Sequence, residues 1–305
     1  MTTTRIGIVF NPAKGETEAL REAVAAATEL PVSWHETSVT DPGVAATRDA
    51  LAAGADLVIA AGGDGTVRAV AEHLADTGAG ADLGIVPLGT GNLLARNLGV
   101  PLGDIPAALE RALGSEPRII DIGWADIGAE RRAFAVMAGF GIDANMIAET
   151  NDDLKDKAGW IAYVESLGRA LSASELLEFD LTVDGETRRA EAHTLIVGNC
   201  GMLQGGFTLL PDADPADGEL DLVIFDADGF GGWMDTVKNV VWDNGIARLF
   251  GRSDEAASTA NVTHTRLMSL DIALDEPRVF EVDGDELGEI TRVRIDVQPG
   301  AVRVR

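Results

Sequence analysis

Cysteine and long apolar runs are both scarce in this chain. Among its 305 residues there is one cysteine, Cys200, and no uninterrupted apolar stretch approaches the ~18 residues that span a bilayer. A single cysteine excludes an internal disulfide, and the apolar run at residues 5–10 is too short for a signal peptide. We therefore expect a cytoplasmic protein whose contact with a membrane is peripheral, at its inner face.

Positive charge is also in short supply. The chain has 24 Lys+Arg against 50 Asp+Glu, a formal net charge of −26, and its lysines are only Lys14, Lys155, Lys157 and Lys238. Such a chain would be repelled by nucleic acid and by anionic lipid, so a nonspecific nucleic-acid binder is excluded. The 46% of apolar residues still suffices for a folded core. The acidic, lysine-poor composition is typical either of a GC-rich coding bias or of adaptation to high salt.

The first third of the sequence alternates between strand and helix patterns. Strands are predicted at 5–10, 32–36, 56–61 and 83–87, with helices at 16–30, 43–53 and 67–76. Strands separated by helices of this length pair in parallel through right-handed crossovers. Ligand sites of such sheets lie beyond the carboxyl ends of the strands.

After about Ile122 the pattern changes to short alternating segments separated by turn residues. Strands are predicted at 132–136, 178–183, 195–197, 220–225, 270–274 and 279–282, with a hairpin turn at Asp184-Gly185. Two helical inserts interrupt them, at 155–171 and 233–249. We expect an α/β nucleotide-binding domain with a parallel sheet (1–122, joined by the tail 293–305). An antiparallel β-rich, sandwich-like domain (123–292) follows, and the active site should lie in the cleft between the two.

A glycine-rich motif, Gly-Gly-Asp-Gly-Thr at 62–66, stands between a buried strand and a helix. Glycines there let backbone N–H groups approach a polyphosphate, and the helix N-terminus adds a favourable dipole. The alternative is an ordinary turn with left-handed glycines in which Asp64 caps the helix. In a phosphate site, Asp64 would hold Mg²⁺ directly or through water, because a bare carboxylate repels phosphate.

Two more loops follow strands at the same predicted edge. One is Pro-Leu-Gly-Thr-Gly-Asn at 87–92, and the other is Asn-Pro-Ala-Lys-Gly at 11–15. Arg96, just beyond the first of these, is more simply explained as a solvated helix cation. Three loops converging on one place favour a nucleotide site over isolated turns.

Two acidic segments have a simple structural explanation and a functional one. Asp283-Gly284 follows a predicted strand, and Asp-Gly is the commonest hairpin-turn signal. The stretch 212–221 carries five carboxylates, which repel one another unless solvent or a cation intervenes. From the residues alone, the turn is favoured for the first, and a solvated loop and a cation site are equally supported for the second.

Together these motifs resemble the diacylglycerol kinase catalytic family, which also contains sphingosine and ceramide kinases and bacterial lipid kinases. The resemblance runs from Asn11–Gly15 through Gly62–Thr66 and Pro87–Asn92 to Asp283–Glu286. The kinase that phosphorylates NAD shares the Gly-Gly-Asp-Gly-Thr motif, so the Pro-Leu-Gly-Thr-Gly-Asn loop is the more specific signal.

The resemblance implies roles for particular residues. The catalytic residues would be Asp283, as general base on the lipid hydroxyl, with Asp285 and Asp64. A structural Mg²⁺ would be bound by Asp214, Asp217 and the backbone carbonyl of Glu219. ATP would be contacted by Asn11, Gly15, Gly62, Gly63, Asp64, Gly65, Thr66, Gly89, Thr90, Gly91 and Asn92, and by either Thr37 or Thr40.

The chain departs from the family pattern in two places. The family usually has Glu directly after Asp-Gly, whereas this chain has Asp285 and then Glu286, so either could be the second carboxylate. The residue two after Thr66 is commonly Asn in the family and is Arg68 here. A contact made by that Asn in the family is therefore not carried over to this chain.

The resemblance implies an ATP- and Mg²⁺-dependent kinase acting on the hydroxyl of a neutral lipid, with diacylglycerol as the first candidate. A sphingoid or ceramide-type lipid, or a soluble substrate such as NAD, is the alternative, and a non-catalytic nucleotide or lipid sensor is a further one. Segments 155–169 and 230–252 combine cations with aromatic residues, as interfacial helices do. They are the predicted membrane contacts, and the sequence leaves a homodimer open.

Overall fold

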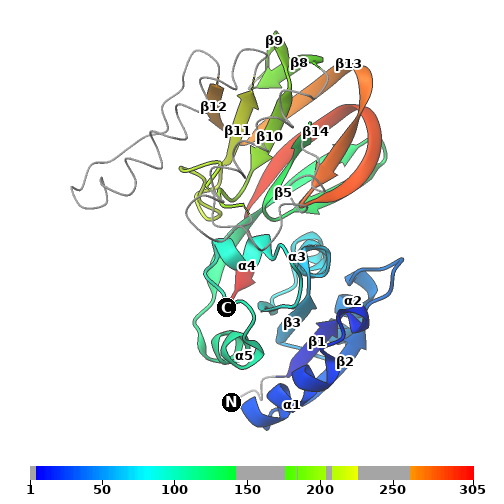
Figure 1. The fold of residues 1–305 in the computed structure, drawn as a ribbon, viewed down its shortest axis with the longest axis vertical. Coiled ribbons are helices and arrows are strands. Elements are labelled where there is room, and N and C mark those ends of the chain that lie inside the picture. Colours follow the sequence, from blue (N-terminus) through cyan, green and yellow to red (C-terminus); the bar gives the residue numbers. More distant parts are fainter. Residues whose placement is uncertain (1–4, 142–175, 184, 204–207, 226–261) are drawn as a thin grey trace, which may run out of the picture.

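The computed structural model describes residues 5–141, 176–183, 185–203, 208–225 and 262–305 (Figure 1). The helical inserts predicted at 155–171 and 233–249 lie outside these residues. No helix in the described ranges is long and apolar enough to cross a membrane.

The first domain is built on four parallel strands. They are β1 (Ile6–Phe10), β2 (Val32–Glu36), β3 (Leu57–Gly62) and β4 (Asp82–Pro87), in the order β4-β3-β1-β2. The helices are α1 (Thr17–Ala27), α2 (Val44–Ala52), α3 (Asp64–Thr77), α4 (Leu93–Asn97) and α5 (Ile105–Gly114). Every residue of β1, β3 and β4 is buried, and since alternate residues point to opposite faces, both faces of the sheet are covered.

The register brings the ends of the parallel strands together. Phe10 pairs with Ala61, and Gly62 pairs with Pro87, so the three segments that follow β1, β3 and β4 start side by side. Backbone bonds continue this arrangement beyond the strands, from Asn11 N–H to the Ala61 carbonyl at 3.1 Å and from Leu88 N–H to the Gly62 carbonyl at 2.8 Å. The motifs predicted to converge therefore share one edge of the sheet.

The second domain is antiparallel, as predicted. Its strands are β5 (Arg118–Ile127), β6 (Glu130–Phe134), β7 (Met137–Phe140), β8 (Leu177–Val183), β9 (Glu186–Ala192), β10 (Thr194–Gly198), β11 (Leu220–Phe225), β12 (Val262–Leu267), β13 (Ser269–Val282) and β14 (Asp285–Val304). Their mutual pairings are antiparallel, including the β8–β9 hairpin in which Val183 faces Glu186. Phe140 and Phe280 meet in its core with ring centroids 4.9 Å apart.

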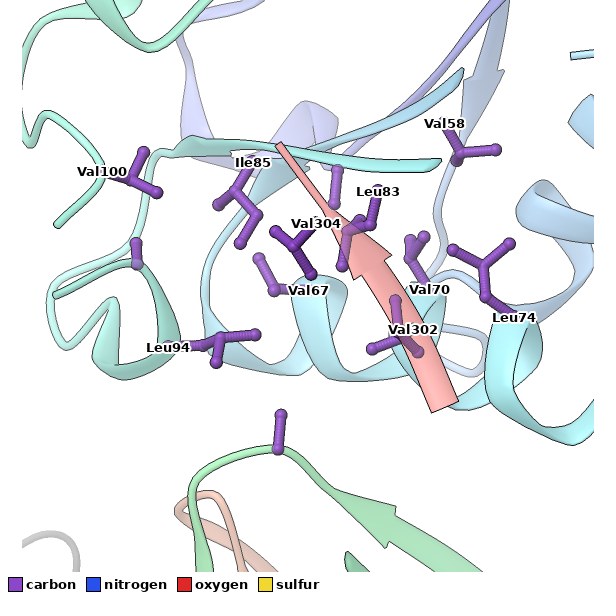
Figure 2. Close-up of a cluster of buried hydrophobic side chains, with 14 of the residues drawn as sticks. Val58, Val67, Val70, Leu74, Leu83, Ile85, Leu94, Val100, Val302 and Val304 are labelled. Carbon is purple, nitrogen blue, oxygen red and sulfur yellow. The ribbon is translucent and has the colours of Figure 1, made fainter. Parts of the chain in front are cut away.

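The long strand β14 joins the two domains. Its residues Val293, Ile295 and Val297 pack in the core of the second domain, whereas Val302 and Val304 pack in the core of the first. Figure 2 shows these last two valines between α3 and the side chains of β4. Val304 pairs in parallel with Leu83, and Asp82 holds the end of the strand through Arg303 at 2.8 Å and Arg305 at 2.6 Å. Both cores therefore share one strand.

Helix α3 starts earlier than its sequence predicts. The pattern places its first residue at Val67, but the helix begins at Asp64, directly after Gly63 as N-cap. An acidic residue in the first turn is favourable to the helix dipole. The glycine motif is thus a one-residue connection, with Asp64, Gly65 and Thr66 in the first turn of α3.

Candidate active site

The two glycine loops of the first domain lie in direct contact. A Cβ placed on Gly89 would lie 2.6 Å from the Gly63 Cα, and one placed on Gly91 would lie 2.7 Å from an Asp64 carboxylate oxygen. Neither Gly63 nor Gly89 has a positive φ. Glycine is required at Gly89 because the two backbones approach closely there, and not because of a left-handed conformation. A Cβ on Gly63 would lie 3.4 Å from the Gly89 Cα, which is an ordinary contact.

Asp64 ties the first glycine loop to the second. Its carboxylate accepts N–H bonds from Asn92 at 2.7 Å and from Leu93 at 2.5 Å, which are the first backbone groups of helix α4. Burial raises the pKa of Asp64, these bonds oppose the rise, and the nearby charge of Asp285 adds to it. Asp64 therefore caps α4 rather than its own helix, α3.

Asn92 closes the second loop on itself. It adopts a left-handed conformation with φ of 49°, and its side chain accepts from the Gly89 N–H at 2.9 Å and donates to the Gly89 carbonyl at 2.7 Å. Arg96 donates to the Gly91 carbonyl at 2.6 Å, so it is not merely a solvated cation. Thr90, between these two glycines, is exposed.

The turn after β1 stands next to the glycine loops. The Asn11 side chain accepts from the Ala13 N–H at 3.0 Å, and Gly15 ends the short turn with φ of 75°. The Lys14 ammonium lies 3.7 Å from where a Cβ on Gly63 would stand. The turn therefore brings an ammonium group to the first glycine loop.

The two candidate threonines after β2 differ in their surroundings. Thr37 is buried, and its N–H donates to the Phe10 carbonyl at 2.9 Å, which places it beside the start of the Asn11 turn. Thr40 is exposed, and its hydroxyl contacts Ser38 at 3.3 Å. Of the two, Thr37 is the one that lies at the strand edge.

In the second domain, Asp283 and Gly284 form the turn between β13 and β14. Both have positive φ, 49° and 85°, and Val282 pairs with Asp285, as in a two-residue type I′ turn. The Asp283 carboxylate points inward and accepts three N–H bonds, from Ala135 at 2.8 Å and from Val136 and Met137 at 2.9 Å each. The turn predicted from the residues and the site carboxylate implied by the family are thus one feature.

The same carboxyl group has an unusual pKa. Burial raises the pKa of Asp283 to about 6, against the opposing effect of the three N–H bonds and the positive charge of Arg68. Each carboxylate has about four acceptor positions, and three are occupied here. One position, on the oxygen that accepts only from Ala135, remains for a further donor.

Asp285 connects this turn to the first domain. It pairs with the Arg68 guanidinium at 2.6 Å, and one of its oxygens lies 3.4 Å from the position of a Cβ on Gly65. Glu286, the next residue, points to the opposite face of the sheet, because successive residues of a strand face opposite ways. The second carboxylate facing the glycine loop is therefore Asp285.

The acidic loop 212–221 lies against the junction of the two domains. Asp214 pairs with Arg118 at 2.5 Å, and Asp217 accepts the Glu219 N–H at 3.0 Å. Burial raises the pKa of Asp221 to about 6. Within the described residues, no group of three or more His, Cys, Asp or Glu side chains is arranged to hold a metal, and the set of Asp214, Asp217 and the Glu219 carbonyl stays a prediction.

Some residues that build the site are absent from the sequence-based prediction. Asp121, a buried carboxylate, accepts from Gly218 and Gly300 at 2.7 Å each and so fixes both the acidic loop and β14. The Asn97 side chain bonds both backbone groups of Met202, across the two domains. Apart from the position of Asn97 just beyond the second glycine loop, no local signal marks these contacts.

Comparison with known proteins reveals similarity along the whole chain. It is 31% identical over its full length to a protein named "Probable lipid kinase YegS-like" from Pseudomonas aeruginosa strain UCBPP-PA14, of which it covers 95%. A Pseudomonas fluorescens Pf-5 protein of the same name is 36% identical over 84% of the chain and 79% of that protein. A crystal structure of a diacylglycerol kinase from Bacillus anthracis has the same fold, with a TM-score of 0.71, 22% identity, and coverage of 100% and 97%.

Family models cover both domains. Residues 5–125 match the diacylglycerol kinase catalytic domain. Residues 135–305 match the YegS C-terminal domain, which is described as similar to the β-sandwich of NAD kinase. With a relative above 30% identity aligned over the full length, the chain belongs to the diacylglycerol kinase catalytic-domain family.

Proposed function

We propose that this protein is a lipid kinase, which transfers the γ-phosphoryl group of ATP to the hydroxyl of a neutral lipid, with diacylglycerol as the substrate to test first. The observation that carries the proposal is the Asp283–Gly284 turn. It presents a buried carboxylate, Asp283, beside a second carboxylate, Asp285, that rests on the glycine loop of the other domain. The names of the relatives support the same reaction.

The residues of the first domain suit a polyphosphate ligand. The glycine loops lack side chains where they meet, Thr90 is exposed, and the Lys14 ammonium adjoins Gly63. These groups, with the Asn11–Gly15 turn, are the ones that would bind the ATP phosphates. The family resemblance implies that Asn92 contacts ATP, but its side chain is bonded to Gly89 and closes the loop.

Mg²⁺ is part of the proposal because it neutralises phosphate charge in such reactions. Each Asp64 oxygen accepts one N–H bond, which leaves one further acceptor position on each for a metal or its bound water. Asp64 therefore fits the predicted role beside the phosphates. It holds the two glycine loops together at the same time.

Asp283 is the proposed general base. Its free acceptor position can receive the proton of the lipid hydroxyl as that oxygen bonds to the γ-phosphorus and the bond from this phosphorus to the ADP oxygen breaks. A pKa of about 6 keeps the group ionised at neutral pH and makes it a stronger base than an ordinary carboxylate. The three N–H bonds fix its orientation.

A transfer assay with γ-labelled ATP tests the substrate class. Diacylglycerol, a sphingoid base, ceramide and NAD are offered separately in detergent, and labelled product is counted in the organic and aqueous phases. We expect label in the organic phase, with diacylglycerol the best acceptor. Label on the sphingoid base or ceramide instead would contradict diacylglycerol as the substrate but keep the lipid kinase proposal. Label only on NAD would refute a lipid kinase.

We also propose that the protein reaches its substrate by peripheral membrane contact through segments 155–169 and 230–252. Reversing two charges there, Lys238→Glu and Arg248→Glu, should weaken sedimentation with anionic vesicles while activity on detergent-dispersed lipid persists. Arg188→Glu, an exposed reversal on β9, is the matched control and should leave vesicle binding unchanged. If Arg188→Glu weakens vesicle binding as much as Lys238→Glu and Arg248→Glu do, the proposed contact is contradicted.

A further inference from the structure

Arg68 lies where α3 meets the second domain. It is the fifth residue of the helix and is 8% exposed. Its guanidinium pairs with Asp285 at 2.6 Å and with Glu72, one helical turn further on, at 3.5 Å. A buried arginine is costly unless it is paired, so its place between two carboxylates calls for a reason.

Glu72 extends the contact to the chain segment whose N–H groups bind Asp283. One of its oxygens accepts from the Ala133 N–H at 3.0 Å and is also the oxygen that pairs with Arg68. Ala133 lies two residues before Ala135, the first of the three residues whose N–H groups bind the Asp283 carboxylate. Arg68 thus contacts Asp285, the residue that follows the Asp283–Gly284 turn. Through Glu72 it also contacts the backbone segment that supports this turn.

The ion pair also sets the separation of two parts of the site. Arg68 follows Gly65 on the same helix, and Asp285 lies against the backbone at Gly65. Pairing with Arg68 therefore draws Asp285, and with it the turn, onto the first glycine loop. The side chain of Asn, if placed at this position, is too short to replace a guanidinium that reaches both carboxylates.

We propose that Arg68 is a positioning residue that holds the Asp283–Gly284 turn of the second domain against the Gly62–Thr66 loop of the first. This inference rests on the proposed kinase function, since it assigns the acceptor side of the reaction to the turn and the donor side to the loop. Stability alone is a weaker explanation, because Asp285 is half exposed and such pairs add little to the free energy of unfolding. Transfer reactions, in contrast, are sensitive to small displacements of the reacting groups.

The test compares Arg68→Asn and Arg68→Lys with Asp285→Asn and with the double variant Arg68→Asn/Asp285→Asn. We expect Arg68→Asn to lower kcat about tenfold or more while KM for ATP stays within about twofold, with partial recovery in Arg68→Lys. The kcat of the double variant should be no lower than that of the less active single variant, because both substitutions remove the same contact. Arg303→Asn is the control, since it removes an ion pair with buried Asp82 outside the site and should affect the melting temperature without changing kcat.

Two results of the activity measurements would overturn the inference in an active enzyme. One is wild-type kcat in Arg68→Asn, and the other is losses in Arg68→Asn and Asp285→Asn that multiply in the double variant. Amide hydrogen exchange of residues 283–287 gives a readout that does not depend on activity, and it should be faster in Arg68→Asn than in Arg303→Asn. An inactive wild type would refute the kinase proposal, whereas unchanged exchange would refute the positioning role.

Discussion

At the scale of single residues, Asp283 combines two properties that usually occur apart. As the first residue of an Asp-Gly turn it adopts φ of 49°, which Asp tolerates better than most residues. Its carboxylate, instead of facing solvent as on most hairpins, is buried and bound by three backbone N–H groups. The hairpin thereby holds the carboxylate that we propose as the base in a fixed orientation at the domain junction.

The pKa of Asp283 predicts the pH dependence of the reaction. A base must be ionised, so kcat/KM should fall about tenfold per pH unit below about pH 6. Unfolding through this group does not explain such a fall. Its raised pKa means that its contribution to stability is fully present below the ordinary value of 3.8 and is lost as pH rises through about 6.

A pH–rate profile between pH 4.5 and 8, taken at saturating ATP with the lipid concentration varied, would measure this fall of kcat/KM on the acid side, the acid limb of the profile. Asp221 also has a pKa of about 6 because of burial, and it lies in the acidic loop rather than in the turn. Asp221→Asn should therefore leave the limb in place. A flat profile in the wild type, or a limb that disappears in Asp221→Asn, would contradict the assignment to Asp283.

At the scale of elements, the close contact between the two glycine loops sets the geometry of the proposed phosphate site. Gly89→Ala would place a Cβ 2.6 Å from the Gly63 Cα, and neither backbone can move without disturbing Asp64. We expect the free energy of unfolding to fall by about 1–3 kcal/mol and ATP binding to weaken. Chemical denaturation and nucleotide titration would measure the two effects.

Gly114→Ala is the matched control for that substitution. Gly114 ends α5, and a Cβ there would meet no atom within 4 Å. Alanine should be neutral or stabilise the helix by up to about 1 kcal/mol. If Gly89→Ala binds ATP as tightly as Gly114→Ala, the close contact of the loops is not needed for the site.

Elements with a clear apolar period were predictable from the sequence, and others were not. The buried strands β1, β3 and β4 are visible in the sequence as apolar runs, and the glycine-containing segments that follow them indicate where the proposed phosphate site lies. Strand β9, Glu-Thr-Arg-Arg-Ala-Glu-Ala, has few apolar residues, because among the described strands it pairs with β8 alone and it is largely exposed. Strand β14 contains Gly288 and Pro299-Gly300, which indicate turns, but the strand continues through irregular pairing with its neighbours.

The partners of the site carboxylates could not be predicted at all. The N–H groups that bind Asp283 lie up to 148 residues earlier in the chain, and the Arg68 and Asp285 side chains lie 217 residues apart. Backbone donors carry no residue-type signal, so only the fold brings them to the turn. Local motifs therefore predict the candidate reacting groups, while the contacts that orient these groups depend on tertiary structure.

At the scale of the whole molecule, the net charge of −26 sets how the protein responds to salt. Acidic side chains repel one another in the folded state, and the Debye length falls from about 10 Å at 0.1 M to about 3 Å at 1 M salt. The melting temperature should therefore rise with NaCl over this range. Sucrose at equal osmolality controls for general solute exclusion and should raise it less. A melting temperature that is unchanged or lower in 1 M NaCl would show that repulsion does not limit stability.

The most direct test of the account is phosphoryl transfer from γ-labelled ATP to diacylglycerol by the wild type, Asp283→Asn and Asp271→Asn. Asp271 lies on the same strand, β13, and is a half-exposed carboxylate paired with Arg294 at 3.7 Å, so its substitution controls for the loss of a negative charge. We predict transfer by the wild type and Asp271→Asn, and none by Asp283→Asn, although that variant still binds ATP. Substantial transfer by Asp283→Asn would contradict its role as the base.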